Sequence, residues 1–199
     1  MSGLYAINLD ADGGSVLDCN FINCPTGAIS APISDWCISG CNFTNVSGGS
    51  ISAGGEGIIS KCIFENCNSS NAGAIFTWQG GSELSVMFIE ITDCSFINCS
   101  SQDIAGAVWA TGPEGIISGC NFMNCSVSNG GGGAIWTDHY NIFNCSFEKC
   151  FAPDSGAVRN NGGNITKCNF TDCNTISDEG MGGAVVWGAN HTSISECIF

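Results

Sequence analysis

The tripeptide Cys-x-Phe recurs along the chain and constrains more than any other feature how the chain can fold. Its eight copies begin at Cys19, Cys41, Cys62, Cys94, Cys120, Cys145, Cys168 and Cys197. Their aromatic members are Phe21, Phe43, Phe64, Phe96, Phe122, Phe147, Phe170 and Phe199. A β-branched aliphatic residue, Val or Ile, stands three positions before each of these cysteines. Agreement at three positions in every copy indicates a structural repeat with one unit per copy.

Two further signatures accompany the tripeptide. Four positions after the cysteine the first five copies carry asparagine, at Asn23, Asn45, Asn66, Asn98 and Asn124, and the next two carry Lys149 and Asp172. The sequence Gly-Ala-Ile or Gly-Ala-Val falls between successive copies, beginning at Gly27, Gly73, Gly106, Gly133, Gly156 and Gly183. The second interval lacks it, and we expect the glycine-rich segment 54–57 to replace it there.

The alternation within the repeat predicts short strands that are buried on one face. Cys and Phe alternate with polar residues, which is the period of a half-buried strand, and 28 glycines argue against helices. One unit holds too few strands to bury a hydrophobic face alone, whereas stacked units pile like residues on one another at about 4.8 Å. The sequence therefore predicts an all-β fold, a parallel β-helix (solenoid) of about seven to eight rungs with columns of Cys, Phe, Ile and Asn.

We expect residues 1–199 to form a single domain of this kind. The sequence stops within a copy of the motif, at Cys197-Ile198-Phe199, without a polar capping segment. An open end of a solenoid exposes unpaired strand edges and apolar interior. We therefore expect a fragment of a longer protein, or else a fibre subunit that associates end to end.

The repeats resemble those of the chlamydial polymorphic outer-membrane proteins and related adhesin-like surface proteins. The matching segments are Gly132-Gly133-Ala134-Ile135 and Gly182-Gly183-Ala184-Val185, paired with Phe122-Met123-Asn124 and Phe170-Thr171-Asp172. The resemblance extends from about Val16 to Phe199 and implies a right-handed, pectate-lyase-like β-helix at the cell surface. It also implies adhesion to a protein or glycan of a host or neighbouring cell. The sequence departs from the family where Cys follows the corner Asn, and we expect no autotransporter barrel within this segment.

The fifteen cysteines admit three interpretations. Six pairs have Cys-x4-Cys spacing, and disulfides within a rung are geometrically possible if the two Cα atoms lie within about 7 Å. A metal site would need four converging ligands, which two columns of thiols do not provide. Free cysteine is also among the most buried residue types. We favour free buried thiols, because Val46 stands where the partner of Cys41 is expected and replaces it in packing only.

Charge argues against a nucleic-acid partner, and the lengths of the apolar runs argue against a membrane span. Lys and Arg number 4 against 18 Asp and Glu, which gives a net charge of -14. Four cations are too few to neutralise a nucleic-acid backbone. We therefore expect no nucleic-acid partner. No run approaches 18 apolar residues, so we expect no membrane span in this segment.

The titratable residues give little support to catalysis. Polysaccharide lyases with this fold need a Lys or Arg base beside carboxylates, and Arg159 is the one cation that replaces an aromatic residue after Gly-Ala-Val. The other cations occupy corner positions: Lys61, Lys149 and Lys167. The acidic pairs Asp10/Asp12 and Asp178/Glu179 and the histidines His139 and His191 lie in loops. We expect a protein that is not an enzyme and has no metal or cofactor; the alternative is a carbohydrate-active lyase or hydrolase.

Large aromatic residues follow several Gly-Ala-Ile/Val motifs. They are Phe76, Trp109, Trp136 and, one place later, Trp187, with Trp78 close to Phe76. If the aliphatic residue points inward, the aromatic residue points outward, so these rings would line one face at the spacing of the rungs. Such a face suits a sugar or an apolar protein surface. The alternative is that the strand turns the other way, or that loops cover the rings and leave them as packing.

Overall fold

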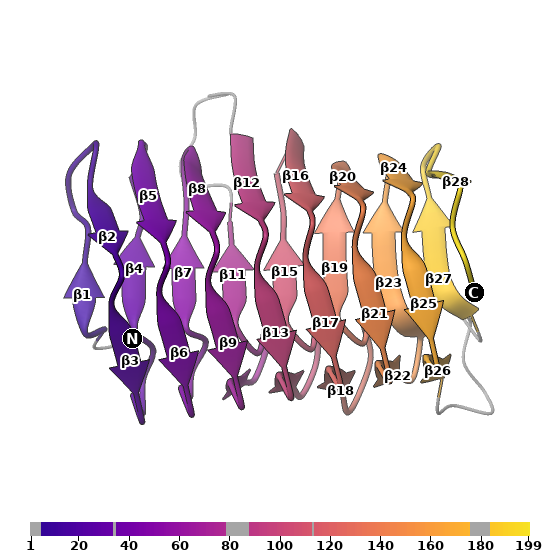
Figure 1. The fold of residues 1–199 in the computed structure, drawn as a ribbon, viewed down its shortest axis with the longest axis horizontal. Helices are drawn as coiled ribbons and strands as arrows, with labels where there is room; N and C mark the ends of the chain where they lie inside the picture. The colour runs from indigo at the N-terminus through magenta and orange to yellow at the C-terminus, as the bar shows by residue number, and fades with distance from the viewer. Residues whose placement is uncertain (1–4, 34, 79–87, 113, 176–183) are drawn as a thin grey trace.

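The computed structural model describes residues 5–33, 35–78, 88–112, 114–175 and 184–199. In these segments the chain winds through four parallel sheets, which we name A to D (Figure 1). Each full turn passes from sheet A to sheet B and then sheet C, and five turns add a short strand of sheet D. The predicted parallel β-helix is confirmed. No helix occurs among the described residues, so none of them forms a helical membrane span.

Sheets A and B contain eight strands each and form two long faces of the solenoid. Sheet A consists of β1 (Ile7–Asn8), β4 (Ile29–Ala31), β7 (Ile51–Ala53), β11 (Ile75–Thr77), β15 (Val108–Ala110), β19 (Ile135–Asp138), β23 (Ser155–Asn161) and β27 (Ala184–Ala189). Sheet B consists of β2 (Ser15–Leu17), β5 (Trp36–Ser39), β8 (Gly57–Ser60), β12 (Phe88–Thr92), β16 (Glu114–Ser118), β20 (Tyr140–Phe143), β24 (Asn164–Thr166) and β28 (Ser193–Ser195).

Sheets C and D complete the turns. Sheet C consists of β3 (Asn20–Ile22), β6 (Asn42–Thr44), β9 (Ile63–Glu65), β13 (Ser95–Ile97), β17 (Asn121–Met123), β21 (Ser146–Glu148) and β25 (Asn169–Thr171). Sheet D consists of β10 (Asn68–Ser69), β14 (Ser100–Ser101), β18 (Ser126–Val127), β22 (Phe151–Ala152) and β26 (Asn174–Thr175).

The phenylalanines of the repeat form the predicted column through the interior. Ring centroids of successive turns lie 4.6 to 4.9 Å apart and the ring planes are parallel within 6°. The column runs without a gap from Phe21 to Phe199, and all its members except Phe199 are buried. Because each ring covers the face of the next, the column contributes apolar burial in every turn.

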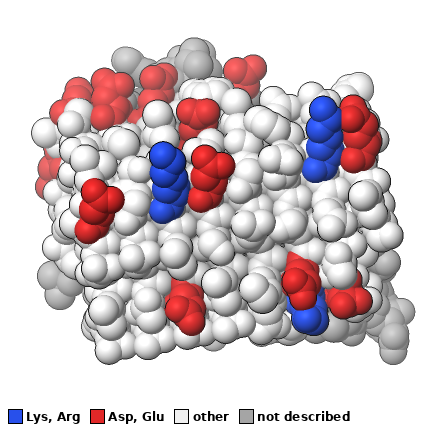
Figure 2. All heavy atoms as spheres, viewed as in Figure 1, with Lys and Arg blue, Asp and Glu red and all other residues white. Residues whose placement is uncertain are grey.

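Each strand of sheet C lies between two corner residues in the left-handed backbone region. The first corner immediately precedes the repeat cysteine and has φ between 52° and 66°, at Asp18, Gly40, Lys61, Asp93, Gly119, Asn144, Lys167 and Glu196. Lys61 and Lys167 are therefore corner residues, as predicted. On the face shown in Figure 2, the Lys and Arg side chains stand beside Asp or Glu side chains.

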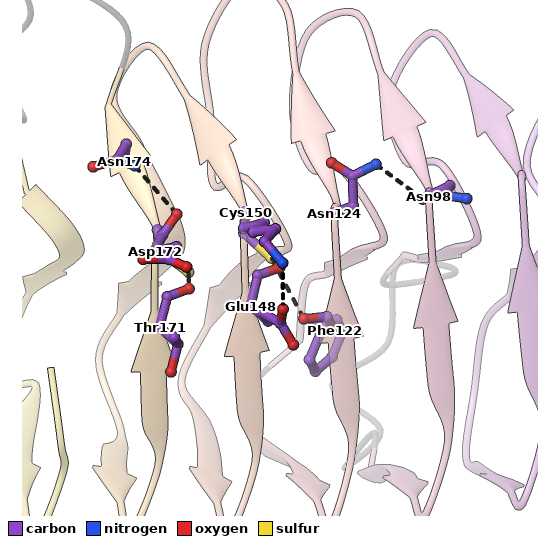
Figure 3. Close-up of polar contacts among 10 residues, drawn as sticks. Asn98, Phe122, Asn124, Glu148, Cys150, Thr171, Asp172 and Asn174 are labelled. Carbon is purple, nitrogen blue, oxygen red and sulfur yellow. Dashed lines mark hydrogen bonds and ion pairs between the residues drawn. The ribbon is translucent and has the colours of Figure 1, made fainter.

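The second corner is the predicted asparagine column. Asn45 donates to Asn23, Asn66 to Asn45, Asn98 to Asn66 and Asn124 to Asn98, with Nδ2–Oδ1 distances of 2.9 to 3.3 Å. Asn fits because it tolerates φ near 55° and its amide both donates and accepts. Figure 3 shows Asn124 pointing toward Asn98 along this column.

Fourteen of the fifteen cysteines form two columns, one directly after each corner, and Cys37 belongs to neither. The thiol of Cys94 contacts those of Cys62 and Cys120 in the neighbouring turns, and Cys150 Sγ lies 3.7 Å from the carbonyl oxygen of Phe122 (Figure 3). Val46 fills the expected position in the second column and is fully buried. All fifteen cysteines are free thiols, and most of them are buried. The thiols therefore serve as small apolar side chains that fit a narrow column.

The motif Gly-Ala-Ile lies where sheet A begins, and here one sequence expectation is wrong. Strand pairing aligns Ile51 with Ile29 and Ile75, so Gly49-Ser50-Ile51 is the equivalent in the second turn, not segment 54–57. The sequence motif did not reveal this equivalence, because Ser50 stands where the other copies have Ala. A Cβ added to Gly106 would meet the carbonyl oxygen of Gly133, so glycine allows the backbones of successive turns to approach closely here.

In one inner column of sheet B, each large aromatic residue stands next to a glycine of the neighbouring turn. The indole of Trp36 fills the space beside Gly57, and the phenol of Tyr140 fills the space beside Gly115. Both large rings are buried. This alternation packs two big rings into a column whose turns are only about 4.8 Å apart.

Replacing Gly115 by Ala should destabilise the fold by about 1–3 kcal/mol, because overpacking forces a buried ring to move. The added Cβ would lie 2.1 Å from Cε1 of Tyr140. Urea-induced unfolding of Gly115→Ala measures the loss. Gly112→Ala is the matched control, because its Cβ approaches only the Tyr140 hydroxyl, at 3.9 Å. Equal stability of the two variants would contradict this packing.

Raising the pH above 9 should destabilise the protein through its buried thiols. Burial raises the pKa of Cys41 from 9.0 to about 11, and contact with Cys94 together with burial raises the pKa of Cys62. Above pH 9 the unfolded chain therefore loses protons that the folded chain retains. The free energy of unfolding should be level up to about pH 8 and then fall, by up to about 1.4 kcal/mol per pH unit for each such thiol.

Urea unfolding at pH 7, 8, 9 and 10 under reducing conditions measures this slope. Cys41→Val should make it shallower, whereas Cys37→Ser should leave it unchanged because Cys37 is partly exposed and belongs to neither column. A free energy of unfolding that stays level to pH 10 would contradict the buried-thiol interpretation.

Candidate binding groove

The predicted aromatic residues lie in one outward column on sheet A. Strand pairing places Phe76 beside Trp109, Trp109 beside Trp136, Trp136 beside Arg159 and Arg159 beside Trp187. Their inward neighbours in β11, β15, β19 and β23 are buried, which confirms the expected orientation. Trp187 joins the column although it comes one place later in its motif, because the pairing of β23 with β27 contains a register shift.

Arg159 occupies an aromatic position in this column. Its Cζ lies 4.3 Å from the ring centroid of Trp136 and 4.5 Å from that of Trp187, so the guanidinium lies between two indoles. Its Nη1 forms an ion pair with Oδ2 of Asp154 at 3.0 Å. Both contacts are favourable for a half-buried guanidinium, whose flat face stacks on aromatic rings while its edge donates hydrogen bonds.

The aromatic rings also pack against one another. The centroids of Phe76 and Trp109 lie 4.5 Å apart, with the rings tilted by 31°, and Trp78 stacks on Phe76 at 5.6 Å. Phe76, Trp109, Trp136 and Trp187 are all partly exposed. The rings therefore support one another and still present surface to solvent.

A polar column runs beside the later part of the aromatic one, two residues after Trp109, Trp136 and Arg159, and it continues at Asn190, just beyond the end of β27. Asn161 Nδ2 donates to Asp138 Oδ1 at 3.1 Å, and Asn190 Nδ2 donates to Asn161 Oδ1 at 2.6 Å. Thr111 occupies the corresponding place after Trp109. Side chains two positions apart in a strand lie on the same face, so this column follows from the same alternation as the aromatic one.

Members of both columns line an open groove of about 260 Å³, although Phe76, the first aromatic residue of the column, is not among them. Its walls are formed by Trp109, Thr111, Trp136, Asp138, Arg159, Asn161 and Trp187. The sequence analysis identified the aromatic residues and considered Arg159, but it missed Thr111, Asp138 and Asn161. These three share no motif, and only their position two residues after each member of the aromatic column could have revealed them.

The remaining sequence candidates do not reach this groove. Lys149 lies at the second corner and pairs with Glu148. His139 and His191 are exposed and have positive φ, as expected for turns. The pair Asp178/Glu179 lies outside the described residues. Within the described part of the chain, no three His, Cys, Asp or Glu residues gather closely enough to hold a metal ion.

Comparison with known proteins supports the architecture seen here. A family model described as the right-handed β-helix region matches residues 5–126. Searches of curated proteins and of solved structures found no match. The likeness to the chlamydial surface repeats therefore stays a prediction, whereas the family match covers more than half of the sequence and the stacked strands continue the pattern to β28. The chain belongs to the right-handed β-helix family.

Proposed function

We propose that this chain is a non-catalytic, adhesin-like recognition protein of the cell surface and that the groove on sheet A binds a glycan. The supporting observation is the pairing of an aromatic column with a polar column along the same face. Partly exposed indoles offer apolar surface to the C–H face of a sugar ring. The carboxylate and amide groups beside them can donate to and accept from its hydroxyls.

The orientation of the two columns suits an extended ligand. Both columns cross the strands at one residue per turn, so equivalent groups repeat at about 4.8 Å along the solenoid axis. Hydrogen bonds along the polar column and the stacking of Arg159 hold the side chains in place before a ligand arrives. Such preorganisation lowers the entropy that binding costs.

Replacing Trp136 by Ala should weaken glycan binding by about tenfold or more, a loss of at least about 1.4 kcal/mol. A glycan array identifies a ligand for the natural sequence, and isothermal titration then compares the variants. Phe143→Ala is the matched control, because Phe143 is also an exposed aromatic residue but lies on sheet B. Failure of the array to find a glycan, or equal affinities of the two variants, would contradict the proposal.

A carbohydrate-active enzyme is the second candidate, and one observation favours it. Arg159 and Asp138 line the same groove, and Asp154 forms an ion pair with Arg159. This is the combination of cation and carboxylates that a lyase or hydrolase of this fold would need. We prefer the non-catalytic function, because stacking between two indoles and pairing with Asp154 hold the guanidinium away from a role as base.

Prolonged incubation with the glycan identified by the array should yield no new reducing ends and no unsaturated sugar. Chromatography of the products with detection of both species is the measurement. Products that form with the natural sequence and disappear in Asp138→Asn would show catalysis and would overturn the non-catalytic assignment.

A further inference from the structure

A second groove lies on sheet B, and neither the repeat motif nor the proposed glycan site accounts for it. It has a volume of about 350 Å³ and its walls include Asp35, Cys37, Glu56, Ile58, Phe88 and Glu90. These residues come from β5, β8 and β12 and from the positions just before them. The groove lies over the early turns, whereas the glycan groove lies over β15 to β27, so the inference does not depend on the proposed function.

The position of the groove follows from strand register. Cys37 pairs with Ile58 and Ile58 with Glu90, so these three side chains form an outward column. Asp35, Glu56 and Phe88 stand two residues earlier in the same three turns and form a parallel column nearer the loops. The two columns face the same side of the sheet.

The base of the groove is rigid. Trp36 lies beneath it with 2% of its surface exposed, and its indole Nε1 donates to the carbonyl oxygen of Gly54 at 2.8 Å. The indole fills the interior space left by Gly57, so the strands beneath the groove are supported from inside. A ligand would therefore meet a preformed surface.

The groove combines apolar surface with negative charge. Ile58 is 42% exposed and Phe88 36% exposed, so two large apolar side chains are available to a ligand. Asp35, Glu56 and Glu90 surround them, and none of the residues that line the groove is Lys or Arg. Figure 2 shows Asp and Glu gathered at this end of the molecule, at the upper ends of the early sheet B strands.

Like charges on successive turns are unfavourable, because equivalent positions of neighbouring strands lie close together. Asp35 and Glu56 occupy such equivalent positions on adjacent turns. Phe88 stands at this position in the next turn, and Glu114 in the turn after that. A cation bound at this end of the groove would face carboxylates of two successive turns. In a chain of net charge -14 the long-range field also attracts cations toward the groove.

We propose that this groove binds a segment of a partner polypeptide in which Lys or Arg stands next to an apolar side chain. The cation would meet Asp35, Glu56 and Glu90, and the apolar side chain would cover Ile58 and Phe88. A bare metal ion fits less well, because it leaves both apolar side chains exposed. The carboxylates also surround the groove and do not converge at one point, and no metal-binding group of three occurs among the described residues.

Cys37 provides a reporter in the groove itself. Its thiol is partly exposed and lines the groove, whereas Cys197 is partly exposed in the last turn and serves as an internal control. The probe is the heptapeptide Lys-Leu-Lys-Gly-Lys-Leu-Lys. One comparison peptide replaces every Lys with Glu, and another replaces every Leu with Ser. Mass spectrometry follows iodoacetamide alkylation of each cysteine with and without peptide.

The Lys-Leu peptide should slow alkylation of Cys37 by about tenfold at saturation and leave Cys197 unaffected. The apparent affinity, from fluorescence anisotropy of the labelled peptide, should fall as NaCl rises from 50 to 300 mM, because salt screens the ion pairs. The Lys-Ser peptide should bind more weakly and the Glu-Leu peptide should not protect Cys37. Equal protection by the Glu-Leu peptide, by spermine or by Ca²⁺ would overturn the proposal.

Two groove variants and two matched controls complete the test. Glu90→Gln and Phe88→Ser should each reduce the affinity for the Lys-Leu peptide about fivefold to tenfold. Glu65→Gln and Phe143→Ser change an exposed carboxylate on sheet C and an exposed aromatic ring of β20 outside the groove, and they should bind like the natural sequence. An affinity that falls equally in controls and groove variants would overturn the assignment to this groove, and Glu90→Gln keeps the test valid if Phe88→Ser misfolds.

Discussion

In-register hydrogen bonding between successive turns is the constraint on which the rest of the structure depends. Each strand of sheets A, B and C pairs in parallel with the equivalent strand of the next turn, so side chains stack on their counterparts except where the register shifts, as between β23 and β27. At this spacing a column accepts only side chains that pack well on their own kind. Flat Phe rings, small thiols and mutually bonding amides all do so, and they form the three columns of the repeat.

The same constraint explains the exceptions. Lys149 and Asp172 occupy the asparagine corner with φ of 53°, because the geometry of neighbouring turns imposes the left-handed conformation on whatever residue stands there. Val46 replaces Cys without disturbing its column, since packing is all that the position requires. Glycine alternates with Trp36 and Tyr140 because two large rings cannot occupy adjacent turns of that column.

Both candidate grooves are lined by outward-facing columns, in which the residue type differs from one turn to the next. The inward Cys and Phe columns of the repeat keep the same kind of residue in most turns, whereas outward columns vary from turn to turn and give each face its own chemistry. Late turns combine Trp, Arg, Asp and Asn on sheet A, and early turns combine apolar and acidic residues on sheet B. A uniform core therefore carries different surfaces at the two ends of one solenoid.

The fold could be predicted from the sequence because Cys, Phe and Asn recur once per turn. Each of them stacks on the equivalent residue of the next turn, so the repeat reveals the columns directly. The inward face and the corner positions of Lys61 and Lys167 follow from that period, and the aromatic column follows from the Gly-Ala-Ile/Val motif. The second-turn match at Gly49-Ser50-Ile51 did not, since one substitution concealed it. Only the tertiary structure decided that Arg159 lies between Trp136 and Trp187 and that Asp138 and Asn161 line their groove. Those contacts join unlike residues of neighbouring turns, and their pairing depends on loop lengths and register shifts that no repeated motif encodes.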